Sequence, residues 1–170
     1  MALPVGPAFA QERAQGAVAA EALYEFDVNL DKRAIGTHRF TVSREADGAT
    51  HISSDASFDV RFLGIVAYRY RHLAREQWQG ECLAAIDAST QDNGRSLHVR
   101  GMQREGGFQL QQPTATLLPA CLAAYAYWNR DLLLRQRALL NPQTGRLDAL
   151  RVDTGGDLGR NAVRQFHQPV

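Results

Sequence analysis

The chain has 170 residues, of which 45% are hydrophobic and 22% are charged, with 19 Lys and Arg against 18 Asp and Glu. This length and apolar content suit one domain with a hydrophobic core and exclude wholesale disorder. A net charge of +1 argues against nucleic-acid binding through a broad basic surface. No apolar run approaches the roughly 20 residues of a membrane-spanning helix, so we expect no membrane span.

The first residues carry a trace of an export signal. Residues 1–10 end in Ala8-Phe9-Ala10, and small residues at positions −3 and −1 are what signal peptidase requires. The basic part and most of the apolar part of a signal are missing. We therefore expect that the true start lies upstream of Met1 or that the sequence begins inside the signal; the alternative is an ordinary disordered tail. Residues 1–21 are assigned to a signal-peptide remnant and disordered lead-in, and the protein is predicted to be periplasmic or secreted.

Alternation of apolar and polar side chains, typical of half-buried strands, dominates residues 22–112. Asp47-Gly48 and Asp92-Asn93-Gly94 are strong hairpin signals. A single strand through residues 49–78 would be about 100 Å long, so the chain must bend or reverse near Gly64. The predicted strands are residues 23–30, 35–44, 49–62, 66–78, 82–90, 95–104 and 108–112.

Six or seven strands joined by short turns predict an antiparallel meander, because no connection has room for the crossover helix of a parallel sheet. We expect the sheet to coil into a barrel or half-barrel with apolar faces inward, since closure hides strand edges. After Pro113 and Pro119 the sequence predicts one or two short helical segments near 120–135. A strand over 136–140 is an alternative, and 147–152 suits a further strand. The fold class is mainly β, with residues 22–152 as a single antiparallel β domain and 153–170 as an irregular tail.

The two cysteines, Cys82 and Cys121, allow two interpretations. In an exported protein an even pair indicates one disulfide, whereas in a cytosolic protein they would be unrelated core thiols. Their spacing does not match a CxxC redox or zinc motif. Because of the signal remnant, we favour a disulfide.

The segment 68–78 carries the densest chemistry, because a strand there puts its aromatic side chains on one face with His72 and Glu76. One interpretation places these two in an aromatic-walled cavity, where the carboxylate raises the imidazole pKa or the pair acts as acid and base. The other is a buried polar cluster in which Glu76 accepts hydrogen bonds from Tyr, Trp or Arg. Aromatic residues near 125–128 suit either a ligand pocket or the core. The ligand-binding candidates are Tyr68, Tyr70, His72, Glu76, Trp78, Tyr127 and Trp128.

Other kinds of site find no support in the sequence. The five histidines show no metal-binding spacing, and although His38 and His72 share a predicted inward side, a third ligand is missing, so no metal is predicted. No GxSxG, GxGxxG or P-loop motif is present, so we expect no covalent nucleophile, no nucleotide and no cofactor.

Six motifs follow one another along the chain. They are Ile35-Gly36-Thr37-His38-Arg39-Phe40, Tyr68-Arg69-Tyr70-Arg71-His72 with Arg75-Glu76-x-Trp78, Gly80-x-Cys82-Leu83, Thr90-x-Asp92-Asn93-Gly94, Tyr127-Trp128-Asn129 and Leu140-Asn141-x-x-Thr144-Gly145. Over about residues 22–150 the chain resembles an uncharacterised family of exported bacterial β-proteins, catalogued as a domain of unknown function. The resemblance implies export, a coiled antiparallel sheet and no assigned activity, and it supplies no catalytic residues.

The chain departs from this family after its last motif. Proteins of this kind usually continue past the Asn-x-x-Thr-Gly turn with several more strands, where this chain has the Gly-rich residues 153–170. We expect a truncated C-terminal part or a frame disruption. The sheet would then lack closing strands and expose an edge that can pair with another chain.

Three functions remain open. We favour a non-enzymatic exported β-protein that binds or carries an apolar small molecule such as a lipid, because the strands present inward apolar faces. The second is a hydrolase or isomerase that uses His72 and Glu76. The third is a structural or envelope-interaction module that self-associates through an exposed sheet edge.

Overall fold

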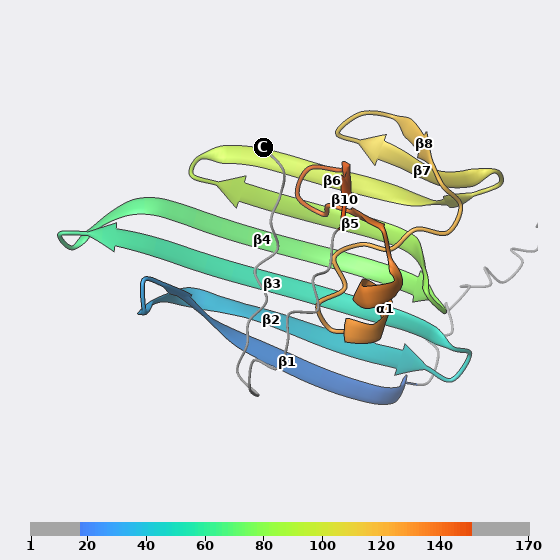
Figure 1. Cartoon of the computed structure of the whole chain (residues 1–170), viewed down its shortest axis with the longest axis horizontal. Coiled ribbons are helices and arrows are strands. Elements are labelled where there is room, and N and C mark those ends of the chain that lie inside the picture. Colours follow the sequence, from blue (N-terminus) through green and yellow to red (C-terminus); the bar gives the residue numbers. More distant parts are fainter. Residues whose placement is uncertain (1–17, 151–170) are drawn as a thin grey trace, which may run out of the picture.

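The computed structural model describes residues 18–150, which form one antiparallel sheet with a covering segment on one face (Figure 1). The order of the strands in the sheet follows the chain, and each strand pairs antiparallel with the next. The strands are β1 (Val18–Leu30), β2 (Arg33–Glu45), β3 (Ala49–Phe62), β4 (Ile65–Gln79), β5 (Cys82–Asp92), β6 (Arg95–Arg104), β7 (Gly107–Gln112) and β8 (Thr116–Leu118).

The mainly β antiparallel meander is confirmed, and the seven predicted strands correspond to β1–β7. The expected reversal occurs at Leu63 and Gly64, whose positive φ angles of 49° and 83° make a two-residue turn. The sequence missed β8, which is three residues long and lies between two prolines, and β1 begins at Val18, inside the expected lead-in. Alternation of apolar and polar residues thus located the long strands. The three residues of β8 are too few to show such an alternation.

The expected closure into a barrel or half-barrel is wrong. The sheet is neither closed nor strongly curled, and β1 and β8 form its two edges. The covering segment, residues 119–150, lies across the apolar face instead (Figure 1). Because this segment buries the middle of the sheet, the core forms without closure.

The covering segment holds the predicted short helix and a second, two-stranded sheet. Helix α1 (Arg130–Arg135) begins after Asn129, whose side chain accepts a hydrogen bond from the backbone of Leu132, as an N-cap does. Strands β9 (Ala138–Leu140) and β10 (Leu147–Ala149) pair antiparallel. No helix within residues 18–150 is long and apolar enough to cross a membrane.

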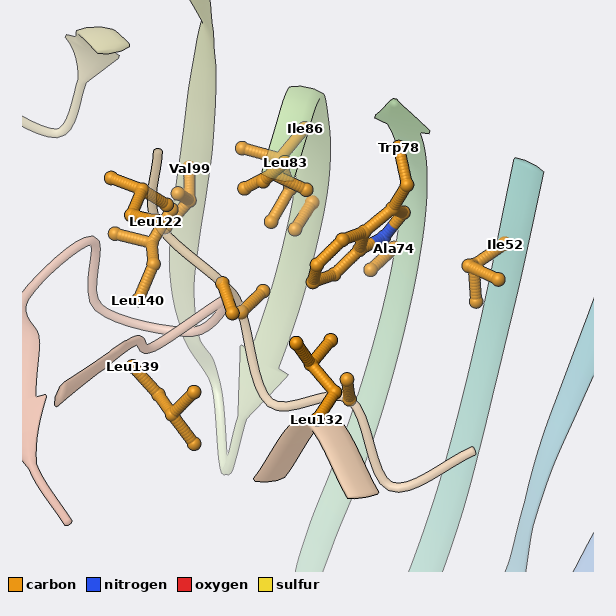
Figure 2. Close-up of a cluster of buried hydrophobic side chains, with 14 of the residues drawn as sticks. Ile52, Ala74, Trp78, Leu83, Ile86, Val99, Leu122, Leu132, Leu139 and Leu140 are labelled. Atoms are coloured by element: carbon orange, nitrogen blue, oxygen red, sulfur yellow. The ribbon is translucent and has the colours of Figure 1, made fainter. Parts of the chain in front are cut away.

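The core lies between the sheet and the covering segment, where Leu122, Leu132 and Leu140 pack against sheet side chains (Figure 2). The predicted disulfide is confirmed: Cys82 at the start of β5 is bonded to Cys121 in the covering segment. Beside it, the backbone N–H of Leu83 donates to the carbonyl of Leu122 at 2.9 Å. The buried sheet residues here include Val42, Ile52, Ala74, Trp78, Leu83, Ile86 and Val99, and we call this part of the inner face the Trp78 end.

The inner face continues beyond the core toward the β3–β4 turn, a region we call the Leu63 end, made of residues 28–33, 58–68 and 92–95. The expectation that every strand buries its apolar face is wrong in part. On the edge strand β1, Tyr24, Phe26 and Leu30 are exposed although they alternate as predicted. These side chains keep 37 to 47% of their surface exposed, so their periodicity is only partly matched by burial.

Candidate functional site

The register of the central strands builds a hollow on the inner face. His38 of β2 lies opposite Ala56 of β3, Ala56 lies opposite His72 of β4, and His72 lies opposite Thr90 of β5. The two histidine backbones are therefore two strand spacings apart, about 10 Å. Because Ala56 between them has a small side chain, the surface is recessed there.

This recess and the covering segment line a half-open cavity of about 340 Å³, within the range of small-molecule sites. Aromatic rings and small apolar side chains make up much of its wall, together with a few polar groups. The sheet contributes His38, Phe40, Ser54, Ala56, Phe58, Tyr70, His72, Ala74 and Glu76, and the covering segment contributes Tyr125, Tyr127, Asn141, Pro142 and Gln143.

Side-chain hydrogen bonds hold the covering residues in place. The Asn141 side chain accepts from the backbone N–H of Gln143 at 2.9 Å and donates to Asp148 Oδ2 at 2.8 Å. The Tyr125 hydroxyl donates to the same carboxylate oxygen at 3.0 Å. The roof of the cavity is therefore a fixed structure in which Asp148 links two of the lining residues.

Both histidines on the floor of the cavity are held in the neutral form. His72 Nδ1 shares a hydrogen bond with Thr90 Oγ1, and His38 Nε2 shares one with Ser54 Oγ, each at 2.8 Å. Burial, together with the smaller effect of the nearby His38, lowers the pKa of His72 to about 4. Burial also lowers the pKa of His38, although Asp55 opposes this shift. Near neutral pH neither imidazole carries a charge.

Glu76 is the carboxylate of the cavity. Its side chain is buried, and Trp78 Nε1 donates a hydrogen bond of 2.8 Å to Oε2. Burial raises the pKa of Glu76 to about 7, against the opposing effect of the hydrogen bond from Trp78. The carboxyl group is therefore about half protonated at neutral pH, and the cavity as a whole carries little charge.

Of the seven ligand-binding candidates, the structure brings four to the cavity wall: Tyr70, His72, Glu76 and Tyr127. The other three lie elsewhere. The Tyr68 hydroxyl donates to Asp92 at 2.7 Å, outside the cavity, and Trp78 and Trp128 pack edge to face within the core, 5.6 Å apart.

The structure adds lining residues that sequence reasoning did not select, above all Ser54, Ala56 and Phe58 of β3. Their alternation marked them as inward-facing, yet only the register shows that they lie between the two histidines. Asn141 and Gln143 belong to a motif that suggested only a turn, and nothing local indicates that this turn faces the sheet.

His72 and Glu76 do not form the pair that one interpretation envisaged. They lie on the same strand and in the same wall, but no hydrogen bond joins them, since Thr90 and Trp78 are their partners. The pKa of His72 is lowered by burial and is not raised by the carboxylate. Among residues 18–150, no group of three or more His, Cys, Asp or Glu side chains is placed to hold a metal ion.

A family model described as a domain of unknown function (DUF6134) matches residues 26–164 of this sequence. The chain belongs to this family. The match extends from β1 through β10, so every residue that lines the cavity lies inside the DUF6134 domain. No curated protein and no solved structure matches the chain.

Proposed function

We propose that this DUF6134 protein is an exported, non-enzymatic protein that binds or carries a small apolar molecule, such as a lipid, in the cavity beneath the covering segment. The observation that supports it most is the combination of volume and charge. A space of about 340 Å³ is walled by Phe40, Phe58 and Tyr70; burial keeps its histidines uncharged and shifts Glu76 toward its protonated form. An apolar ligand enters such a site without displacing a hydrated ion.

The polar groups suit the head of such a ligand. His38 and His72 each use one ring nitrogen on a hydroxyl partner, and the structure gives the other nitrogen no partner among residues 18–150. A neutral imidazole nitrogen can accept from a hydroxyl or carboxyl group, or donate to it, according to its tautomer. We infer a ligand with an apolar body and one uncharged hydrogen-bonding end.

The disulfide supports the proposed export. Disulfides form and persist in oxidising compartments and are rare in the cytosol. The Cys82–Cys121 bond is thus consistent with a periplasmic or secreted protein.

A fluorescent fatty acid tests the proposal. We expect the wild-type protein to take it up, and Ala56→Leu to weaken uptake roughly tenfold or more, because the larger side chain fills the space between the histidines. Thr37→Leu is the matched control, since it places the same side chain on the exposed opposite face of the sheet. No uptake by the wild type, together with a ligand-free mass in native mass spectrometry of the purified protein, would refute the proposal.

A second candidate is a hydrolase or isomerase that uses His72 and Glu76. The observation in its favour is that one cavity holds two ionisable groups whose pKa values are shifted in opposite directions. Turnover of aryl esters that disappears in His72→Gln, while fatty-acid uptake is retained, would support it. A wild type that turns over nothing would exclude it for this substrate class.

The free side of β1 supports a third candidate, an interaction module that self-associates. Within the described part of the chain this 13-residue strand pairs only with β2, and it exposes Leu23 and Phe26. A long unpaired edge is a template for strand addition. Sedimentation velocity that shows a monomer at all accessible concentrations would exclude it.

A further inference from the structure

The turn between β3 and β4 has an unusual residue for its backbone. Leu63 and Gly64 both have positive φ angles, 49° and 83°, the geometry of a type I′ hairpin turn. The β5–β6 turn at the same end of the sheet has nearly the same geometry, with 45° at Asn93 and 93° at Gly94. Asn-Gly is the preferred pair for this turn, whereas a leucine in the left-handed region is strained.

The residues around this turn are also among the most exposed apolar side chains of the described chain. Phe62 is 70% exposed, Leu63 is 87% exposed and Ile65 is 73% exposed. Three large apolar side chains at a hairpin tip contribute nothing to the core, and one of them strains the backbone. Folding does not account for this choice of residues.

Basic side chains lie beside and behind the apolar tip, in slight excess over the acidic Asp31, Asp59 and Asp92. Arg61 donates a hydrogen bond to the carbonyl of Gly64, with 3.4 Å between the atoms, so its guanidinium is held beside the turn. The neighbouring β1–β2 turn carries Lys32 and Arg33, with one acidic residue, Asp31. In Figure 1 the β3–β4 turn projects beyond the β1–β2 and β5–β6 turns at the same end of the sheet. The apolar tip is thus foremost and the basic residues lie behind it.

We propose that the β3–β4 turn, residues 61–65, docks on a membrane surface that carries anionic lipids. Phe62, Leu63 and Ile65 enter the boundary between headgroups and acyl chains, while the basic residues behind them contact the headgroups. Interfacial binding of this kind scales with buried apolar area and with attraction to anionic lipids, and both contributions are present at this tip. The inference goes beyond the cavity and does not depend on what the cavity binds.

The shape of the tip favours a bilayer over a protein partner. A stable protein interface buries about 800 Å² on each partner, over roughly 20 residues or more. The exposed tip offers three large apolar side chains on a projecting turn, which is too little surface for such an interface. A lipid surface takes up a few projecting side chains without needing a complementary pocket.

Vesicle co-sedimentation of the full chain tests the proposal. We expect the wild type to sediment with vesicles of phosphatidylethanolamine and phosphatidylglycerol, to bind phosphatidylcholine vesicles more weakly, and to lose binding as salt is raised. Leu63→Asn combined with Ile65→Thr should weaken binding roughly tenfold or more, because two inserted side chains become polar. Asn93 occupies the same turn geometry, so the variant should still fold.

Leu73→Asn is the matched control, since Leu73 lies on β4, is 55% exposed and faces away from the cavity. It should bind vesicles like the wild type. Fatty-acid uptake should be unchanged in all three proteins, which separates a failure of docking from a failure of the cavity. Wild-type protein that stays in the supernatant, or equal binding by the tip variant, would overturn the proposal. So would a wild type that dimerises through the tip and ignores vesicles.

Discussion

The two ends of the inner face differ in what lies over them, although the same strands run through both. At the Trp78 end, β3 and β4 present Ile52, Ala74 and Trp78, which are buried beneath residues 119–150 (Figure 2). At the Leu63 end the same two strands end in Phe62 and Ile65, which are exposed. Apolar alternation thus gives a strand a face that can be buried. Which part of that face becomes core depends on where the covering segment packs against it.

The cavity lies between these two ends. Trp78 donates to Glu76 at its covered side, and Phe58 and Tyr70 stack with ring centroids 5.1 Å apart at its other side. A ligand there would border the core on one side and the exposed apolar strands on the other. The proposed ligand site and the proposed membrane tip are therefore on one continuous face.

The largest expected effect concerns the attachment of the covering segment. Replacing both cysteines, Cys82→Ala with Cys121→Ala, should lower the free energy of unfolding by about 4 kcal/mol, because the bond closes a loop across 39 residues. Urea denaturation followed by tryptophan fluorescence measures it. Reductant should destabilise the wild type similarly and leave the double variant unchanged. A decrease in the free energy of unfolding of less than about 1 kcal/mol would mean that packing alone holds the covering segment on the Trp78 end.

The next effect concerns the buried carboxyl of the cavity. The pKa of Glu76 is raised from its ordinary 4.5 to about 7 in the folded protein, so the folded state binds a proton more tightly between these values. The protonated Glu76 therefore stabilises the folded protein fully below about pH 4.5. This stabilisation is lost as the pH rises through 7. Glu76→Gln removes this loss and should be more stable than the wild type by about 3 kcal/mol above pH 7, with little difference near pH 4.5.

Protonation of His72 changes the free energy of unfolding in the opposite sense over an overlapping pH range. Its pKa falls from 6.5 to about 4 on folding, so its contribution is lost as the pH falls from 6.5 through 4. In Glu76→Gln this dependence remains, and stability should rise between pH 4 and 6.5. Glu105→Gln, at the exposed β6–β7 turn, is the control and should follow the wild type. Identical pH profiles for Glu76→Gln and the wild type would show that water reaches the carboxyl group.

The smallest effect is expected at the Leu63 end, and its sign is opposite to that of a core substitution. Leu63→Asn should raise the free energy of unfolding by about 1 kcal/mol, since it relieves a strained leucine at positive φ. Leu140→Ala, in the covering segment over the Trp78 end, should instead lower it by about 3 kcal/mol, because this side chain is fully buried. Thermal or urea unfolding of both variants measures the contrast. Destabilisation by Leu63→Asn would mean that the tip is part of a packed structure after all.

Much of the fold follows from local pattern. Alternation with period two located the long strands, and the length limit on a single strand required a reversal near Gly64, which occurs at Leu63–Gly64. The signal remnant favoured the disulfide that joins Cys82 to Cys121. The candidate site was predicted in part, because His72 and Glu76 share a strand face whatever the rest of the chain does.

The rest of the fold and of the candidate site depends on which segments, far apart in the sequence, pack against one another. Whether the sheet closes is decided by how residues 119–150 lie across it, and no periodicity in β1–β8 encodes that placement. Likewise, Ser54 and Ala56 join His38 and His72 in one wall only through strand register, and Asn141 reaches the cavity only because the cover folds back. Where the strands run, and which side of each is apolar, follows from the sequence alone, because these are properties of neighbouring residues. Tertiary structure alone decided which apolar surface is buried, since burial requires a partner that lies far away in the chain.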